Sequence, residues 1–72
     1  MTFKKTNSRT WKCREGNTIA IIDKYQGYRD TTYYLEVYTV DTFGNIEKSI
    51  CSHKDFYKLN EAKSYARLKL NS

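Results

Sequence analysis

The stretch TTYYLEVYTV, residues 31–40, decides the fold class, because almost every residue in it is β-branched or aromatic. Such residues favour strands, where their side chains pack on a pleated surface. We therefore predict a half-buried strand over residues 31–40. Period-two alternation divides its side chains between two faces, with Tyr33, Leu35, Val37 and Thr39 on one and Tyr34, Glu36, Tyr38 and Val40 on the other.

Further strand patterns lie on both sides of this stretch. Residues 10–14 alternate apolar and polar side chains, residues 18–25 are rich in β-branched side chains, and residues 46–51 repeat the strand pattern. Turns are expected around Gly16 and Gly44, because glycine adopts positive φ at little cost. Such short connections predict an antiparallel meander of three to four strands.

The last third of the chain changes period and predicts an amphipathic helix. Its apolar residues recur at spacings of three and four. Ser52 and Asn60 are both possible N-terminal caps, and a break near Asn60 is favoured. The apolar stripe consists of Phe56, Leu59, Ala62, Ala66 and Leu70.

The expected fold class is therefore α+β, in the order β-β-β-β-α, with the helix packed across one face of the sheet. Residues 1–9 are polar and basic and are expected to form a flexible arm, and residues 10–72 to form a single domain. If Tyr33, Leu35 and Val37 meet the helix, Tyr34 and Tyr38 project from the open face.

The net charge of +5 is unevenly distributed. Residues 1–14 carry five bases and no acid, residues 15–53 are mildly acidic, and residues 54–72 are again basic. This distribution indicates an anionic partner, most often nucleic acid, although extra lysines also serve solubility. With no apolar signal stretch or membrane-spanning run, and only two cysteines, a cytoplasmic protein with reduced thiols is expected, in the host cytoplasm if the protein is viral.

Exposed aromatic side chains beside cations suggest how nucleic acid would bind. Tyr34 and Tyr38 on the open face would stack on bases or sugars, unless they only stabilise cross-strand pairs. On the helix, Lys54 and Lys58, and likewise Lys63 and Arg67, stand four residues apart, an arrangement that phosphates would stabilise but that also suits a solvated face. The predicted nucleic-acid contacts are Lys4, Lys5, Arg9, Lys12, Arg14, Arg29, Tyr34 and Tyr38.

The sequence gives little support for a metal site or a catalytic nucleophile. Cys13, Cys51 and His53 could gather around zinc, but their spacing matches no common site. A nucleophile formed by Cys51 and His53 lacks an orienting third group and an oxyanion loop. We therefore predict no enzyme activity, no metal site and no cofactor.

The segment YYLEVYTVDTFGNIEKS followed by NEAKSYARLKL, about residues 33–70, resembles the arm-type DNA-binding domains of tyrosine-recombinase integrases. That resemblance implies a three-stranded sheet inserted into the major groove and supported by the helix. Residues 53–59 and the strand around Trp11 depart from the pattern. The strand order is also similar to that of the β-β-β-β-α transcriptional coactivators that bind single-stranded DNA as dimers.

The expected function is that of a small nucleic-acid-binding module, with DNA favoured over RNA as the partner. The alternative is a compact phage-type accessory protein that inhibits a host enzyme or defence complex by protein–protein binding. In that case Tyr and Phe side chains would anchor the interface. A homodimer through the open face or an edge strand is a further possibility, and no membrane partner is expected.

Overall fold

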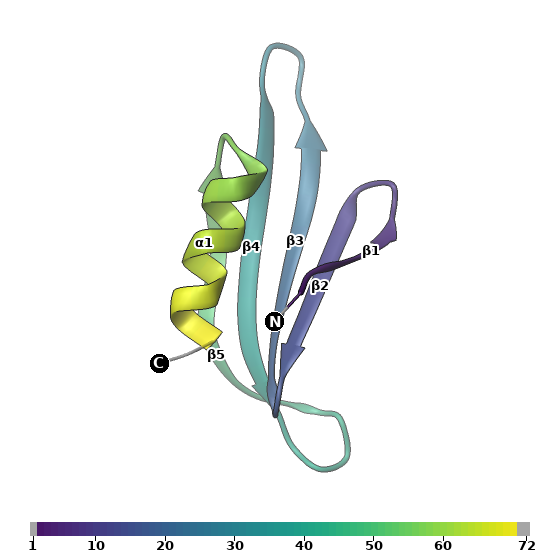
Figure 1. Ribbon diagram of the computed structural model, residues 1–72, viewed down its shortest axis with the longest axis vertical. Helices are drawn as coiled ribbons and strands as arrows, with labels where there is room; N and C mark the ends of the chain where they lie inside the picture. Colours follow the sequence, from purple (N-terminus) through teal and green to yellow (C-terminus); the bar gives the residue numbers. More distant parts are fainter. Residues whose placement is uncertain (1, 71–72) are drawn as a thin grey trace.

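The computed structural model describes residues 2–70, with only the backbone for His53, and it consists of a five-stranded antiparallel sheet and one helix (Figure 1). This confirms the predicted α+β fold, a meander followed by a C-terminal helix. Met1, Asn71 and Ser72, which belong to the predicted arm and domain, lie outside the described residues. The elements are β1 (Lys4–Asn7), β2 (Thr10–Glu15), β3 (Thr18–Gln26), β4 (Thr31–Val40), β5 (Ile46–Phe56) and α1 (Leu59–Leu70).

Strand β1 corrects the prediction of a flexible arm over residues 1–9. It pairs antiparallel with β2, and Lys4 lies opposite Lys12. Strand β1 is exposed and lacks the alternation of apolar and polar residues that would predict a strand. It is held instead by this pairing and by Phe3, which is buried in the core just before the strand. The sheet therefore has one strand more than the predicted maximum of four.

The sheet is a simple meander, in which each strand pairs with its neighbours in the chain, in the order β1-β2-β3-β4-β5. Gly16 and Gly44 both adopt positive φ, as their turns predict. In the β4–β5 turn, one carboxylate oxygen of Asp41 accepts hydrogen bonds from the backbone N–H groups of Phe43 and Asn45, both at 2.9 Å. This carboxylate therefore fixes the turn.

The junction between the last strand and the helix differs from the prediction. Strand β5 continues past Cys51 to Phe56, so Ser52 lies in a strand and cannot cap the helix. The helix begins at Leu59, next to the predicted break at Asn60. The pairing of β4 with β5 is irregular, with register shifts on both sides of Val37. Among the described residues, no helix has the length and apolar character needed to cross a membrane.

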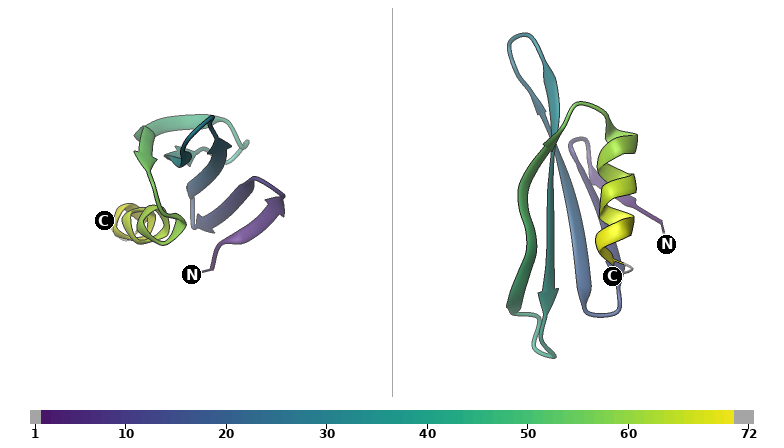
Figure 2. Two further views of the ribbon diagram at one scale, coloured as in Figure 1. Left: turned by 90° about the horizontal axis from the view of Figure 1, so that it is seen from above. Right: turned by 90° about the vertical axis from the view of Figure 1, so that its left-hand side faces the viewer.

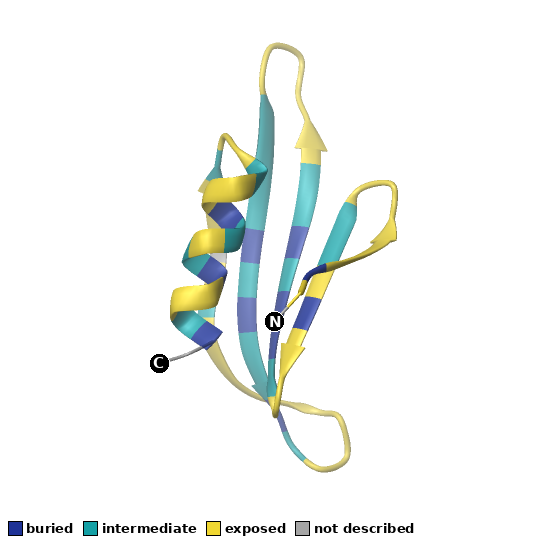
Figure 3. Ribbon diagram, viewed as in Figure 1, coloured by how far each residue is buried: buried dark blue, intermediate teal, exposed yellow. Residues whose placement is uncertain are grey.

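The hydrophobic core lies between α1 and one face of the sheet, here called the helix side (Figures 2 and 3). Ala62, Ala66 and Leu70 form the buried line of the helix, and they pack with Leu35 and Val37 of β4 in one cluster. Tyr33 packs against the same cluster. The helix thus covers the face that carries these three β4 residues, which leaves the opposite face, the open face, to Tyr34 and Tyr38.

The helix covers only part of its side of the sheet. It contacts β3, β4 and β5, and β2 lies beyond it (Figure 1). There Phe3 and Cys13 complete the core, and Trp11 is half-buried against it. On β2, Trp11 is therefore a helix-side residue that remains partly accessible beside the helix.

Replacing Gly44 with alanine is expected to destabilise the fold. Its φ of 87° lies where a Cβ is unfavourable, although the space around it is open. A non-glycine residue in the left-handed region costs about 1–2 kcal/mol. In a domain of this size, each kcal/mol lowers the melting temperature by about 4–8 °C. Circular dichroism melting curves measure this fall in melting temperature. Gly44→Asn should cost less, because asparagine tolerates this region, and equal melting of Gly44→Ala and the wild type would contradict the argument.

Candidate nucleic-acid interface

Three of the predicted phosphate contacts come together on the open face. Lys4 and Lys12 lie directly opposite each other on β1 and β2, and cross-strand partners share a face. Arg14 follows two residues after Lys12, on the same face. A shallow cavity of about 320 Å³ lies among these side chains. These three cations therefore form one cluster at the edge of the sheet.

The other predicted cations lie elsewhere. Lys5 lies opposite Trp11 on the helix side, with its Nζ 5.5 Å from the centre of the indole ring. Arg9 is exposed in the turn between β1 and β2, and Arg29 is exposed in the loop between β3 and β4. The structure thus divides the predicted set between two faces and two turns.

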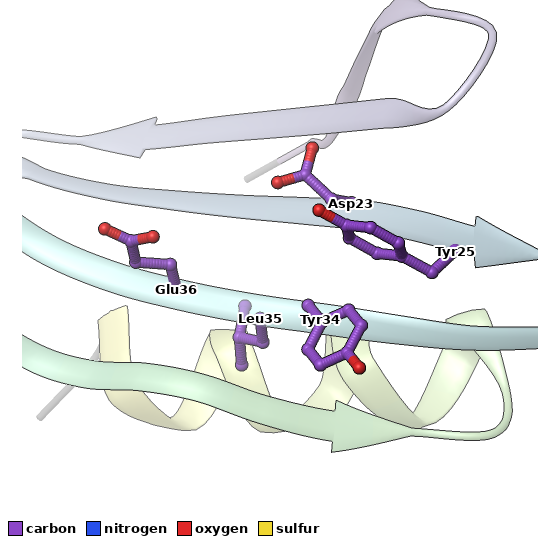
Figure 4. A pocket seen from close by; sticks show the side chains of 5 residues that line it. All are labelled: Asp23, Tyr25, Tyr34, Leu35 and Glu36. Carbon is purple, nitrogen blue, oxygen red and sulfur yellow. The ribbon is translucent and has the colours of Figure 1, made fainter.

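The predicted stacking tyrosines have unequal surroundings on the open face. Tyr34 lies opposite Asp23 of β3, and Glu36 follows two residues later (Figure 4). On its other side, Tyr34 lies opposite Asp55 of β5. Tyr38 lies between Ile19 and Ser49, and Arg14 lies beyond Ile19. Both rings are half-buried. Tyr34 therefore has a carboxylate opposite it on each neighbouring strand, and carboxylates repel phosphate.

A second combination of aromatic rings and cations lies on the helix side. The rings of Trp11 and Tyr33 are tilted by 60° with their centres 6.1 Å apart, and both are half-buried. Lys5 lies over the indole ring. Lys24 of β3 lies directly opposite Tyr33 and therefore on the same face. Two rings and two cations are thus held together by strand pairing.

The helix adds two cations on its flank toward β3 and β2. Tyr65 lies on the flank of α1 toward β5, because its ring contacts that of Phe56 at 5.5 Å. At about 3.6 residues per turn, Lys63 and Arg67 fall on the opposite flank, toward β3 and β2.

We call this group of residues the basic strip. It combines two cations and two aromatic rings of the sheet with two cations on the adjacent flank of α1. The carboxylates Asp23, Glu36 and Asp55 project from the open face instead. The basic strip consists of Lys5, Trp11, Lys24, Tyr33, Lys63 and Arg67.

The two cations beside Tyr65, Lys54 of β5 and Lys69 of α1, have a structural role. The Nζ atom of Lys54 lies 4.8 Å from the centre of the Tyr65 ring, and that of Lys69 lies 5.3 Å from it. Cation–π contacts at exposed sites contribute about 0.5–1 kcal/mol each. The contact of Lys54 therefore helps to hold α1 against β5, whereas that of Lys69 lies within the helix.

The two cysteines occupy opposite ends of one row across the helix side, Cys13 on β2 and Cys51 on β5. Three strand spacings of about 4.8 Å separate them, far more than the distance at which two thiolates share a zinc ion. Residues 2–70, apart from the side chain of His53, which is not described, contain no group of three or more His, Cys, Asp or Glu placed to hold a metal. Burial keeps the Cys13 thiol protonated at neutral pH, since it raises the pKa.

Comparison with protein-family models, curated proteins and solved structures yields no match to this chain. The candidate interface therefore depends on its geometry alone. Lys24 and Tyr33 were not among the predicted contacts, because their proximity depends on the β3–β4 register, which the sequence does not reveal. Lys63 and Arg67 carried a usable signal, the spacing of four residues, but the sequence does not tell which way that flank faces.

Proposed function

We propose that this protein binds single-stranded nucleic acid through the basic strip. The observation that carries the proposal is the position of Lys5 and Lys24 beside the Trp11–Tyr33 ring pair, with Lys63 and Arg67 on the flank of α1 toward β3 and β2. Phosphates bind cations without regard to sequence, and unpaired bases stack on aromatic rings. The combination is typical of surfaces that follow a single strand.

The cations of the strip would contact the nucleic-acid backbone, and its aromatic rings would contact the bases. Four cations would contact phosphates: Lys5 from β1, Lys24 from β3, and Lys63 and Arg67 from α1. Trp11 presents part of its ring to solvent while the rest packs against the core. Such a fixed ring loses little freedom on binding, and stacking contributes about 1–3 kcal/mol per base.

Titration with a short oligothymidylate tests the proposal through the fluorescence of Trp11, the only tryptophan in the chain. Stacking on the indole should quench its emission. With four phosphate contacts at about 0.7 each, the logarithm of the association constant should fall with the logarithm of salt concentration at a slope of about −2.8. Unchanged emission at low salt, or binding that does not depend on salt, would contradict the proposal.

The alternative, binding to a host protein, is favoured by exposed aromatic side chains. Tyr28 is fully exposed in the β3–β4 loop, and Phe43 is 88% exposed in the β4–β5 turn. These two residues lie at opposite ends of a molecule about 41 Å long (Figure 1). One compact interface would therefore use the Tyr28 end or the Phe43 end.

A pull-down from nuclease-treated host lysate separates the two functions. The alternative predicts that the wild type retains a defined protein. Only one of the two single substitutions, Tyr28→Ala or Phe43→Ala, should abolish this capture. Capture that disappears on nuclease treatment would favour the basic strip. Exposed aromatic anchors typically contribute about 2 kcal/mol or more at such interfaces, about a thirtyfold change in affinity.

A further inference from the structure

The open face contains a pocket of about 280 Å³ that the proposed nucleic-acid binding does not use (Figure 4). Its walls come from β3 and β4. Leu35 also lines it, but the Leu35 side chain belongs to the core on the helix side. The side chains that give the pocket its chemistry are Asp23, Tyr25, Tyr34 and Glu36.

Strand geometry explains why these four side chains meet. Asp23 and Tyr25 are two residues apart on β3, and Tyr34 and Glu36 are two residues apart on β4, so each pair shares a face. Asp23 lies directly opposite Tyr34 in the β3–β4 pairing. On the other side of Tyr34, Asp55 of β5 adds a third carboxylate to the same row.

The carboxylates of this region have no cationic partner among the described residues. Asp23 accepts one hydrogen bond, at 2.8 Å from the hydroxyl of Thr10, which is a neutral group. The chain has thirteen Lys and Arg residues and eight acids. The lack of a cationic partner here is therefore not explained by a shortage of basic residues. Two of these carboxylates, Asp23 and Glu36, instead line the cavity.

The two rings add to the preference for a cation. Tyr25 and Tyr34 form an edge-to-face pair with centres 4.7 Å apart and planes at 87°. An aromatic ring attracts cations at its face through its quadrupole. Two carboxylates and two rings around one cavity therefore favour a ligand that is cationic, flat enough to lie on a ring and able to donate several hydrogen bonds.

Guanidinium meets these requirements better than other biological cations. It is planar, stacks on aromatic rings and donates in a fork that matches carboxylates. An ammonium group is compact and strongly hydrated, and a trimethylammonium group donates no hydrogen bond to Asp23 or Glu36. We propose that this pocket binds the arginine side chain of another polypeptide. Because it lies on the face opposite the basic strip, the protein would bind a nucleic acid and an arginine-bearing protein at once.

The test uses N-acetyl-arginine methylamide as the probe, with the lysine and citrulline analogues as comparisons, followed by ¹H–¹⁵N NMR of the whole protein. Citrulline has nearly the shape of arginine but no charge. The arginine probe should cause saturable shifts in the amides of residues 23–25 and 34–36. The lysine probe should bind more weakly, and the citrulline probe should cause no saturable shift there. Equal responses to arginine and citrulline would overturn the proposal.

A charge-removing variant with a matched control locates the site. Asp23→Asn with Glu36→Gln keeps the shape of the pocket, and the amide oxygen of the first substitution can still accept the hydrogen bond from Thr10. We expect affinity for the arginine probe to fall about tenfold or more, since hydrogen bonds to charged groups are strong. Glu61→Gln, which removes a carboxylate on the exposed surface of α1, should leave the affinity unchanged. Undiminished binding by the double variant would refute the assignment.

Nucleic-acid titration of the same double variant keeps the two proposals apart. Oligothymidylate affinity should stay the same or rise slightly, because two negative charges are removed from the opposite face. A variant that loses the arginine response but retains oligothymidylate binding supports the pocket as a separate site. Loss of both responses from the folded variant would contradict the separation of the two surfaces.

Discussion

Reversing the charges of Lys63 and Arg67 together is expected to reduce the affinity for oligothymidylate by about 25-fold at 0.1 M salt. Each lost phosphate contact removes about 0.7 from the slope of log K against log salt, so two contacts correspond to about 1.4 logarithmic units at this concentration. The slope itself should change from about −2.8 to about −1.4. Fluorescence titration of Lys63→Glu/Arg67→Glu at several salt concentrations measures both quantities.

The matched control makes the same charge change on the open face. Lys4→Glu with Lys12→Glu alters the net charge equally, but these residues lie opposite each other on the face away from the helix. Charges separated by more than a Debye length, about 10 Å at 0.1 M salt, are largely screened. The control should therefore lose little affinity. The reverse outcome, a large loss in the control alone, would contradict the basic strip and favour the cluster of Lys4, Lys12 and Arg14.

Leu35→Ala is expected to remove most of the stability of the fold. Leu35 is completely buried at the centre of the core. A buried leucine truncated to alanine costs about 2–5 kcal/mol, because the lost contacts leave a cavity. A single core in a chain this short provides a total stability of only about 3–5 kcal/mol. Urea unfolding followed by circular dichroism gives the change in the free energy of unfolding.

Leu68→Ala is the control, because it removes the same atoms from a leucine that is 70% exposed on the helix. Surface substitutions of this kind usually change stability by less than about 0.5 kcal/mol. Similar losses for Leu35→Ala and Leu68→Ala would show that α1 does not cover the face of β4 that carries Leu35. A large loss for Leu35→Ala alone would agree with the packing seen here.

The elements whose side chains alternate between core and solvent could be predicted from the sequence. In β4, period two correctly separated Tyr33, Leu35 and Val37 from the tyrosines of the open face. In α1, spacings of three and four residues identified the buried line of Ala62, Ala66 and Leu70. Both patterns arise because one face of each element is buried. The periodicity of buried apolar residues is the strongest structural signal in a local sequence.

Strand β1 and the far end of β5 could not be predicted, since neither is specified by local hydrophobicity. Lys4–Asn7 is exposed throughout, so it forms a strand only because β2 offers an edge to pair with. The candidate site was hidden for a related reason. Whether Lys24 lies beside Tyr33, and whether Asp23 lies beside Tyr34, depends on the register between β3 and β4, which is a property of the pair of strands.

The meander order has a consequence for how the chain reaches this fold. Because every strand pairs with the strand next to it in the chain, each hairpin closes a short loop, and short loops lose little entropy on closure. The sheet can thus assemble while the protein is being synthesised. The alanines of α1 that fill the core emerge from the ribosome after all five strands, so a ribosome-bound chain lacking this helix exposes the apolar surface of Leu35 and Val37.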